Sequence, residues 1–585
     1  MYTGFVEDMP RGGPCSGLPL ISLMQLQDLK KWEFFNNLHN YLRIDINNNK
    51  TTLIMRKATL MTTIACAAML VLSSCCGEGR INGTKIQDGN NLVGLITDSE
   101  TGKGIAGVAV SDGYTFAVTD KNGVYQFVGN PLTRIVYYTT PAEYKINLDE
   151  QTKQPVFYRH CEFNPDAVNR NDFSLAPMES VEDELTLIVI SDPQCKNDRH
   201  VKRFRTESIP DMQRTINAGV ESGKYKNVYA LVLGDLVYDY LDQWDNMKDV
   251  MSNVEINDGQ GYLPFFNSIG NHDHYEDCVD DYAGCQNYVD RFGPTDYSFD
   301  RGNVHFVTMD NVFYKKHNTY DSGFTDAQVE WLKADFDLVK DKENKMLVFY
   351  AHVPFRGGAE KGGGNVNYDK HYDDVLKLFT QFKEVHVMIG HTHHPENYMH
   401  HNYITKSGLP VYEHVLGAVS GAWWHTNTCT DGTPNGYAIF TVKDNTVDNF
   451  VYKPVDLDEN YQMRVYNGSQ KYSGSKKLTF GWPEEYHGCF IADVFNDDAE
   501  NWKVEFIQNG VVTPMTRVTK KLRDWCMFAY FIMRTAEARR IPLTTPASST
   551  TGLFLHRQAI LPRRRTGRSV QPTQYLPAAR SMSTL

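Results

Sequence analysis

The sequence predicts a layered α/β domain in the middle of the chain, flanked by two smaller β domains. Apolar runs such as Leu185–Ile190 and Val228–Leu233 fit strands that are buried on both faces. Helical segments separate these runs, and strands that alternate with helices build a layered α/β domain. Short strands separated by glycine-containing turns occur before and after this region, a pattern typical of β-sandwiches.

Each of five apolar runs in the middle of the chain ends in a short polar cluster. The clusters are Ser191–Gln194, Gly234-Asp235, Gly270–Asp273, Ala351–Pro354 and Gly390–His393. Ligand sites form at strand ends in open α/β sheets, so we expect these clusters to meet at one edge of one sheet. Carboxylate and amide oxygens mixed with imidazoles are metal-ligand types. One such cluster is common in ordinary loops, but five in order favour a metal site.

The connections between the clusters read as helices. Pro210–Ser222 has proline in its first turn, and Thr325–Gln328 forms a capping box before a run with apolar positions. Asp373–Phe382 has a buried stripe of the kind a surface helix needs. Val304–Met309 is a further strand, and we interpret the Asp310 carboxylate that follows it as a turn residue.

The order of these motifs resembles that of the calcineurin-like metallophosphoesterases. That family has Asp-x-His, Gly-Asp, Gly-Asn-His-Asp/Glu, a lone His and Gly-His-x-His, and the likeness covers about the middle half of this chain. It implies an αββα sandwich over residues 180–453 that holds two divalent metal ions. Mn, Fe and Zn all suit such mixed donors, and the sequence does not choose among them.

The resemblance also implies a role for each motif residue. Asp192 and His393 would hold one metal, with Gln194 where the family usually has His; Asn271, His352 and His391 would hold the second, and Asp235 would bridge both. Gln194 is the one departure. An amide oxygen is a weaker donor than an imidazole, so this departure bears on the occupancy of the first site.

The chemistry expected of such a centre is phosphoester hydrolysis. Two divalent ions clamp the phosphoryl group, and a hydroxide between them attacks phosphorus in line with the leaving oxygen. His272 would protonate that oxygen as general acid, with Asp273 orienting it; a supporting hydrogen bond is the alternative role for His272. His274, Arg356 and His394 are candidate substrate contacts because they lie next to the clusters. Trp423-Trp424 is either packing or a stacking platform.

Two other classes of protein compete with a hydrolase. One is a lipid-anchored surface binding protein with a relic, weakly occupied metal site, which the loss of several ligands would favour; only Gln194 departs. A metallopeptidase is the other, but the chain has no His-Glu-x-x-His. The net charge of -12 argues against a nucleic-acid partner.

Length and composition indicate several folded domains. A chain of 585 residues is too long for one core, and 41% hydrophobic residues is typical of folded proteins. The 11 cysteines show no CxxC ladder. Cys278 and Cys285 are close enough in sequence to pair in an oxidising compartment, and free thiols are the equal alternative.

The N-terminal region reads as a secretory leader. Residues 55–75 begin Met55-Arg-Lys, continue as a short apolar run and end Leu72-Ser-Ser-Cys75. That ending resembles a bacterial lipoprotein box, which implies lipid on Cys75 and a lipid-anchored protein of the bacterial cell envelope, either periplasmic or surface-exposed. We expect translation to begin at Met55, with residues 1–54 a non-native upstream extension.

Residues 84–178 and 454–525 are the two flanking β domains. The first has strands separated by Asp-Gly and Asn-Gly turns and resembles the carboxypeptidase regulatory-like fold; we expect it to act as a spacer. After Trp525 the chain contains no Lys and no Asp. This shift predicts that residues 526–585 are a frameshifted or disordered tail and that the C-terminal β domain is truncated.

Overall fold

The computed structural model describes residues 79–256, 261–317, 319–355, 371–469, 471–473, 479–498, 500–518 and 553–557. The chain divides into two units, Met1–Gly79 and Arg80–Leu585, and the described helices and strands lie in the second. Among the described residues, no helix is both long enough and apolar enough to cross a membrane. The predicted leader, with Cys75, lies outside the described residues.

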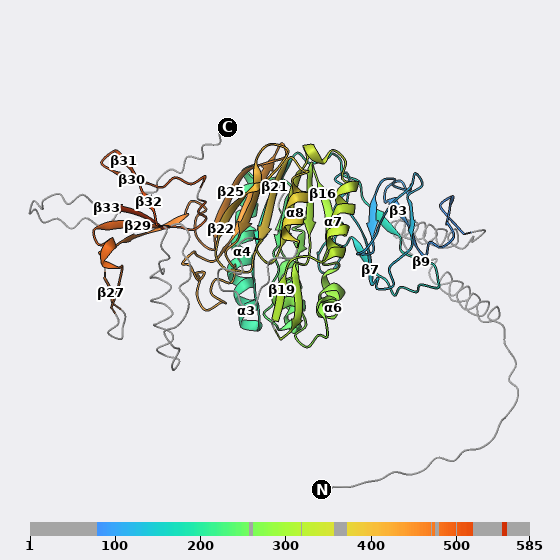
Figure 1. The fold of residues 1–585 in the computed structure, drawn as a ribbon, viewed down its shortest axis with the longest axis horizontal. Helices are drawn as coiled ribbons and strands as arrows, with labels where there is room; N and C mark the ends of the chain where they lie inside the picture. The colour runs from blue at the N-terminus through green and yellow to red at the C-terminus, as the bar shows by residue number, and fades with distance from the viewer. Residues whose placement is uncertain are drawn as a thin grey trace, which may run out of the picture. The chain divides into compact units, whose positions relative to one another are not determined.

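The middle of the chain contains two large sheets (Figure 1). The five-stranded sheet has the order β15 (Phe265–Asn267), β12 (Val228–Val232), β11 (Glu184–Ile190), β24 (Gly436–Lys443) and β25 (Thr446–Pro454). The six-stranded sheet has the order β16 (Tyr297–Arg301), β17 (Val304–Thr308), β20 (Met346–Ala351), β21 (Glu384–Ile389), β23 (Pro410–Val415) and β22 (Glu396–Ile404). In each sheet the strands that precede the polar clusters run parallel to their neighbours in that set.

The two sheets pack face to face. Side chains of β11 alternate between two apolar clusters: Leu185 and Leu187 lie in one, and Ile188 lies in the other. The first cluster includes the space between the sheets, where Phe266 of β15 stacks on Phe299 of β16 with ring centroids 3.8 Å apart. This burial on both faces is the reason that the strand reads as a continuous apolar run.

Helices cover the outer face of each sheet. The five-stranded sheet carries α4 (Ile209–Glu221) and α5 (Trp244–Met251), whose buried side chains share a cluster with β11 and β12. The six-stranded sheet carries α7 (Asp326–Leu338) and α8 (Tyr372–Phe379), seen beside β16 and β21 in Figure 1. Thr325 and Gln328 form the expected capping box. The αββα layering predicted from the sequence is confirmed, as are the three predicted helices, α4, α7 and α8.

The remaining helices and hairpins of the middle region lie outside the two large sheets. They are α3 (Asp198–Arg203), a π-helical turn (Phe204–Ser208), α6 (Asp281–Phe292), the short helices Leu241–Gln243, Asn271–Asp273 and Lys342–Asn344, and the strands β13 (Glu255–Ile256), β14 (Gly261–Tyr262), β18 (Val312–Lys316) and β19 (Thr319–Ser322). Cys278 and Cys285 are free thiols. Of the two alternatives, a disulfide and two free thiols, the structure shows the free thiols.

The N-terminal β region consists mainly of two four-stranded sheets. Its strands are β1 (Arg80–Ile81), β2 (Thr84–Lys85), β3 (Leu92–Asp98), β4 (Ala109–Ser111), β5 (Phe116–Val118), β6 (Val124–Phe127), β7 (Ile135–Tyr138), β8 (Tyr158–His160), β9 (Asn169–Arg170) and β10 (Phe173–Leu175). The segment after β7 reaches the core: Thr140 forms a parallel bridge with Phe299 of β16. Arg301, fully buried, donates to the carbonyls of Pro141 and Tyr144.

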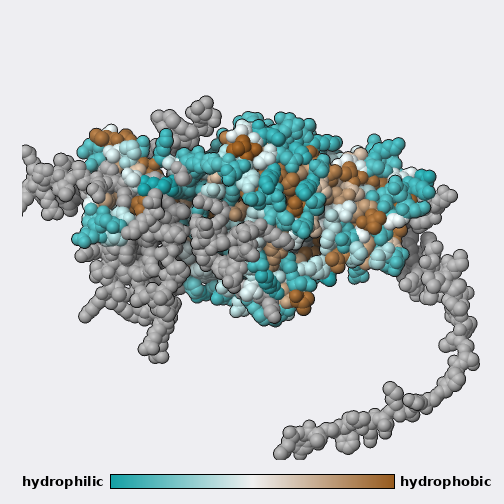
Figure 2. Space-filling view, in the orientation of Figure 1, coloured by the Kyte–Doolittle hydropathy of each residue, from teal (hydrophilic) through white to brown (hydrophobic). Residues whose placement is uncertain are grey.

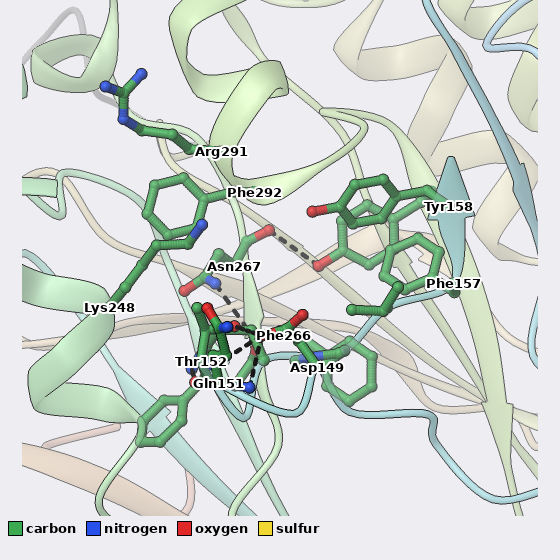
Figure 3. Close-up of a pocket in the computed structure, with 15 residues that line it drawn as sticks. Asp149, Gln151, Thr152, Phe157, Tyr158, Lys248, Phe266, Asn267, Arg291 and Phe292 are labelled. Atoms are coloured by element: carbon green, nitrogen blue, oxygen red, sulfur yellow. Dashed lines mark hydrogen bonds between the residues drawn. The ribbon is translucent and has the colours of Figure 1, made fainter. Parts of the chain in front are cut away.

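A cleft of about 210 Å³ lies between this region and the core (Figure 3). Asp149, Thr152 and Tyr158 of the N-terminal region line it, together with Phe266 and Lys248 of the core. None of the predicted metal ligands lines it. The face of the molecule in Figure 2 is mostly hydrophilic, with scattered apolar residues.

The C-terminal β region follows β25. Its strands are β26 (Met463–Asn467), β27 (Lys471–Ser473), β28 (Thr479–Gly481), β29 (Cys489–Val494), β30 (Glu505–Gln508), β31 (Val511–Pro514), β32 (Thr516–Arg517) and β33 (Leu553–Arg557), with a short helix Glu484–Tyr486. β33 falls within the predicted tail, and its backbone pairs antiparallel with β29 and β32. The domain boundaries remain predictions.

Candidate metal centre

The predicted ligands lie at the ends of five strands that belong to two sheets. Asp192, Gln194, Asp235 and Asn271 follow β11, β12 and β15 of the five-stranded sheet; His352, His391 and His393 follow β20 and β21 of the six-stranded sheet. The expectation of a single sheet was therefore wrong. A strand that is buried on both faces has the same apolar sequence pattern in either sheet. The pattern therefore could not assign the strands to two different sheets.

Backbone geometry brings the strand-end loops unusually close together. A Cβ atom on Gly270 would lie 2.2 Å from Asp235 Oδ1, and one on Gly234 would lie 2.9 Å from His352 Nδ1. Several of the predicted ligands have positive φ, a region that costs free energy for residues other than glycine: Asp192, Gln194, Asp235, His391 and His393. Such strained residues cluster at functional sites.

One group of donor atoms converges around His352. Its Nε2 lies 3.2 Å from His391 Nδ1 and 3.0 Å from Asn271 Oδ1, and Asn271 Oδ1 lies 3.1 Å from His391 Nδ1. Asp235 Oδ2 lies 3.3 Å from the same Nε2. His352 Nδ1 faces the Leu233 carbonyl at 2.8 Å, so Nδ1 carries the proton that this acceptor needs. Nε2 is thereby directed to the group.

The pKa values of the two facing imidazoles are shifted in opposite directions. Burial opposes charge on His352, but Asp235 raises its pKa to about 9. Burial and the neighbouring His352 lower the pKa of His391 to about 3. Burial also opposes ionisation of Asp235, yet His352 and His272 hold its pKa far below the usual range. Two ring nitrogens and an amide oxygen thus converge beside an ionised carboxylate, an arrangement that suits a divalent cation.

The second group is built around Asp192, which is fully buried. Its Oδ1 lies 3.2 Å from His393 Nε2, and its Oδ2 accepts from Ser191 Oγ and from the His391 amide at 3.0 Å. Burial raises the pKa of Asp192, but His393 and His352 together outweigh burial and hold this pKa below its usual value.

Several buried atoms of the site have no hydrogen-bond partner. They are Asp192 Oδ1, Gln194 Oε1 and His393 Nδ1. Gln194 Nε2 donates to Asp235 Oδ2 at 2.7 Å, which places its unpaired oxygen in the same site. Buried polar atoms rarely remain unpaired, so these atoms fit the ligands of a metal ion. Asp192, Asp235 and His352 each offer a ligand atom, and these atoms all lie within 4.8 Å of one another.

His272 lies beside this centre, and its partner differs from the expected one. Its Nδ1 lies 2.6 Å from Asp239 Oδ1, and its ring stacks on Tyr238 with centroids 4.1 Å apart. Burial lowers the pKa of His272, but Asp235 and Asp239 raise it above its usual value.

Asp273 holds the loops together instead of orienting His272, which corrects that part of the prediction. Its carboxylate accepts from the amides of Gly270, Leu236 and Val237 at 3.0 to 3.2 Å. The short helix Asn271–Asp273 turns this side chain back toward the β12 loop. Burial, together with Asp235, raises the pKa of Asp273 to about 6.

The three candidate substrate contacts have different outcomes. The His274 side chain is 0% exposed and bonds to the Gly270 carbonyl, so a role in substrate contact is wrong. His394 is 9% exposed, and its Nε2 has no hydrogen-bond partner. Arg356 lies outside the described residues. Trp424 is packing, since it is buried and donates to the Pro193 carbonyl, whereas Trp423 is 37% exposed and lies 5.0 Å from the His393 ring.

Sequence reasoning missed two residues of this site. Asp239 occurs in a loop without periodicity, and its only signal was its position four residues after the Gly-Asp motif. Tyr320 lies on β19, and its hydroxyl is 3.3 Å from His391 Nε2. No local pattern distinguishes that tyrosine from a packing residue.

Family models match most of the chain. The model for Calcineurin-like phosphoesterase matches residues 185–395, that for the N terminal of Calcineurin-like phosphoesterase matches 90–178, and that for the C terminal of Calcineurin-like phosphoesterase matches 413–546. The chain belongs to the calcineurin-like phosphoesterases, with the N- and C-terminal domains that accompany that core. No curated protein matches the sequence.

The solved structures that match this chain include two phosphatases. A dimetal phosphatase from Danio rerio is 14% identical, with a TM-score of 0.31, and the match covers 47% of this chain and 96% of that chain. A purple acid phosphatase from yellow lupin (Lupinus luteus) seeds is 12% identical, with a TM-score of 0.33, and the match covers 59% and 68%. PhoD is 10% identical, with a TM-score of 0.30, and the match covers 66% and 83%.

Proposed function

We propose that this protein is a dinuclear metal-dependent phosphoester hydrolase. The convergence of His352, His391 and Asn271 donor atoms within about 3 Å of one another, beside Asp235, carries this proposal. Divalent ions bound there would neutralise charge on phosphoryl oxygens and make water a nucleophile at neutral pH. Asp235 would bridge the two ions, and its contacts with both His352 and Gln194 support this role.

His272 is the proposed proton donor to the leaving oxygen. Asp239 holds its Nδ1, which leaves Nε2 as the atom that transfers the proton. Stacking on Tyr238 fixes the plane of the ring. A positioned imidazole of this kind contributes about 10²–10⁴-fold to turnover when the leaving group is poor.

The test compares two kinds of ester. We expect His272→Ala to keep its metal and to lose about 10²–10⁴-fold in turnover of alkyl phosphoesters, with a much smaller loss for activated aryl esters. Asp239→Asn is the matched variant, because it keeps the proton donor and weakens only its orientation; its loss should be smaller and again confined to alkyl esters. Equal losses on both esters in His272→Ala would contradict the acid role. Active wild-type protein with only trace metal would contradict the whole proposal.

We also propose that the protein is lipid-anchored through Cys75 in a bacterial cell envelope. The support is the sequence alone, a short apolar run ending Leu72-Ser-Ser-Cys75. Fractionation of expressing cells measures this directly. Recovery of an unlipidated chain from the aqueous fraction would contradict it.

A further inference from the structure

A second cluster of metal-ligand side chains, two of them buried and Asp281 half-buried, lies apart from the residues assigned to the candidate centre. His274 follows the short helix Asn271–Asp273, Asp281 is the first residue of α6, and Asp310 follows β17. Each offers a ligand atom, and these atoms lie within 4.8 Å of one another. Three separate elements therefore meet at one point.

The tautomer of His274 directs a lone pair into this cluster. Its Nδ1 lies 2.9 Å from the Gly270 carbonyl oxygen, an acceptor only, so Nδ1 carries the proton. Nε2 is buried without a hydrogen-bond partner, although Asp310 Oδ2 lies 3.3 Å away. Tyr314 stacks on the ring with centroids 4.9 Å apart and fixes its plane. A buried polar atom without a hydrogen-bond partner is unusual, and imidazole nitrogens are common metal ligands.

The two carboxylates are oriented in the same way. Asp281 Oδ1 accepts from the Tyr314 amide at 2.6 Å, and Asp310 Oδ1 accepts from the Val312 amide at 2.9 Å. The second bond is the turn that the sequence predicted for Asp310. In both residues one oxygen is committed to the backbone, which leaves the other oxygen for the cluster. Such bonds from the surroundings typically orient metal ligands.

Positive side chains are scarce at this cluster. In the described part of the chain, no Lys or Arg forms an ion pair with Asp281 or Asp310, and His274 is the basic group that lies beside Asp310. A divalent cation would supply positive charge to these two carboxylates.

The same residue types elsewhere in this domain form an ordinary ion-paired triad. His305 Nδ1 lies 2.7 Å from Asp300 Oδ1, and Nε2 lies 2.8 Å from Asp335 Oδ2. Both ring nitrogens therefore have hydrogen-bond partners, and no bonding capacity remains. His274 lacks the second of these bonds.

We propose that His274 Nε2, Asp281 and Asp310 bind a third divalent ion, of the Mn²⁺ or Zn²⁺ type. One imidazole with two carboxylates suits these ions. The ion would fasten the loop that carries His272 to α6 and β17. This site is independent of the proposed hydrolase function, because none of its residues belongs to the centre.

Metal analysis of purified full-length protein tests the proposal. Wild type, Asp281→Asn, Asp310→Asn and the control Asp335→Asn are equilibrated with Mn²⁺ or Zn²⁺, freed of loose ions by gel filtration, and analysed for metal per chain. We expect Asp281→Asn and Asp310→Asn each to hold about one ion fewer than wild type. Asp335→Asn should match wild type, since His305 and Asp335 form an ion pair only.

The outcome does not depend on turnover, so it is separate from the test of hydrolysis. Metal contents of Asp281→Asn and Asp310→Asn equal to wild type would overturn the proposal and leave His274 in an ion pair with Asp310. If neither variant folds, the wild-type count at saturating Mn²⁺ or Zn²⁺, where the candidate centre is filled, decides: three ions per chain support the third site, and two or fewer overturn it.

Discussion

The candidate metal centre and the His305 triad are both buried groups of histidines and carboxylates, yet they differ in what their atoms still lack. Every ring nitrogen of the triad faces a carboxylate oxygen at 2.7 or 2.8 Å. In the centre, the ring nitrogens of His352 and His391 face each other at 3.2 Å, and Asp192 Oδ1 has no hydrogen-bond partner. Residue type alone therefore does not distinguish a metal site from an ion-paired triad. The distinguishing feature is the presence of buried nitrogen and oxygen atoms without hydrogen-bond partners.

The largest expected effect is the difference between substituting Asp235 in the candidate metal centre and substituting Asp335 in the His305 triad. Asp235→Asn weakens the proposed bridge between two ions, so we expect loss of metal and a fall in turnover of about 10³-fold, equivalent to about 4 kcal/mol. Asp335→Asn removes a charge partner of His305 and should cost about 2–3 kcal/mol of folding stability while metal and turnover stay near wild type. Metal analysis, turnover and thermal unfolding measure the three effects. A similar fall in metal content in both variants would contradict the assignment of Asp235 to a metal centre and of Asp335 to an ion pair.

The triad should also give stability a particular pH dependence. Burial opposes charge on His305, but Asp335 and Asp300 raise its pKa to about 9, above the value of about 6.5 in an unfolded chain. The folded state thus holds this proton more tightly, so its contribution is complete below about pH 6.5 and is lost as pH rises through about 9. A shift of this size corresponds to about 3 kcal/mol.

His305→Gln isolates that contribution. We expect the difference in denaturant midpoint between wild type and this variant to be larger at pH 6 than at pH 9.5, as measured by parallel unfolding curves. Other groups that titrate in this range affect both proteins equally and cancel in the difference. A difference that stays constant over the range would show that His305 does not carry a proton in the folded protein.

The smallest effect is expected at the one position that departs from the family pattern. Gln194→His replaces an unpaired buried amide oxygen with a stronger imidazole donor but removes the bond from Nε2 to Asp235. These changes oppose each other, so metal affinity should stay within about tenfold of wild type or become tighter. Calorimetric titration with Mn²⁺ measures it. A large loss of affinity would mean that the amide, through its bond to Asp235, is the group that the centre requires.

The sequence predicted the strands and the ligand clusters because both depend on local patterns. Buried apolar runs mark strands such as β11, and a polar residue directly after such a run has to lie at a sheet edge. Contacts between loops have no local signature. The pairing of His272 with Asp239, rather than with the adjacent Asp273, depends on how two loops fold against each other. Burial of His274 depends on the same packing, which single-sequence periodicity does not report.

The bridge between Thr140 and Phe299 bears on whether the core domain can be expressed without the N-terminal region. β16 is the outermost strand of the six-stranded sheet, and an uncovered edge strand is a template for pairing with other chains. The segment after β7 covers that edge, and its carbonyls also hold the buried Arg301 guanidinium. A core domain expressed without residues 84–178 would expose both the strand edge and the charge. In solution, the N-terminal region would therefore protect the metallophosphoesterase core from aggregation through this strand.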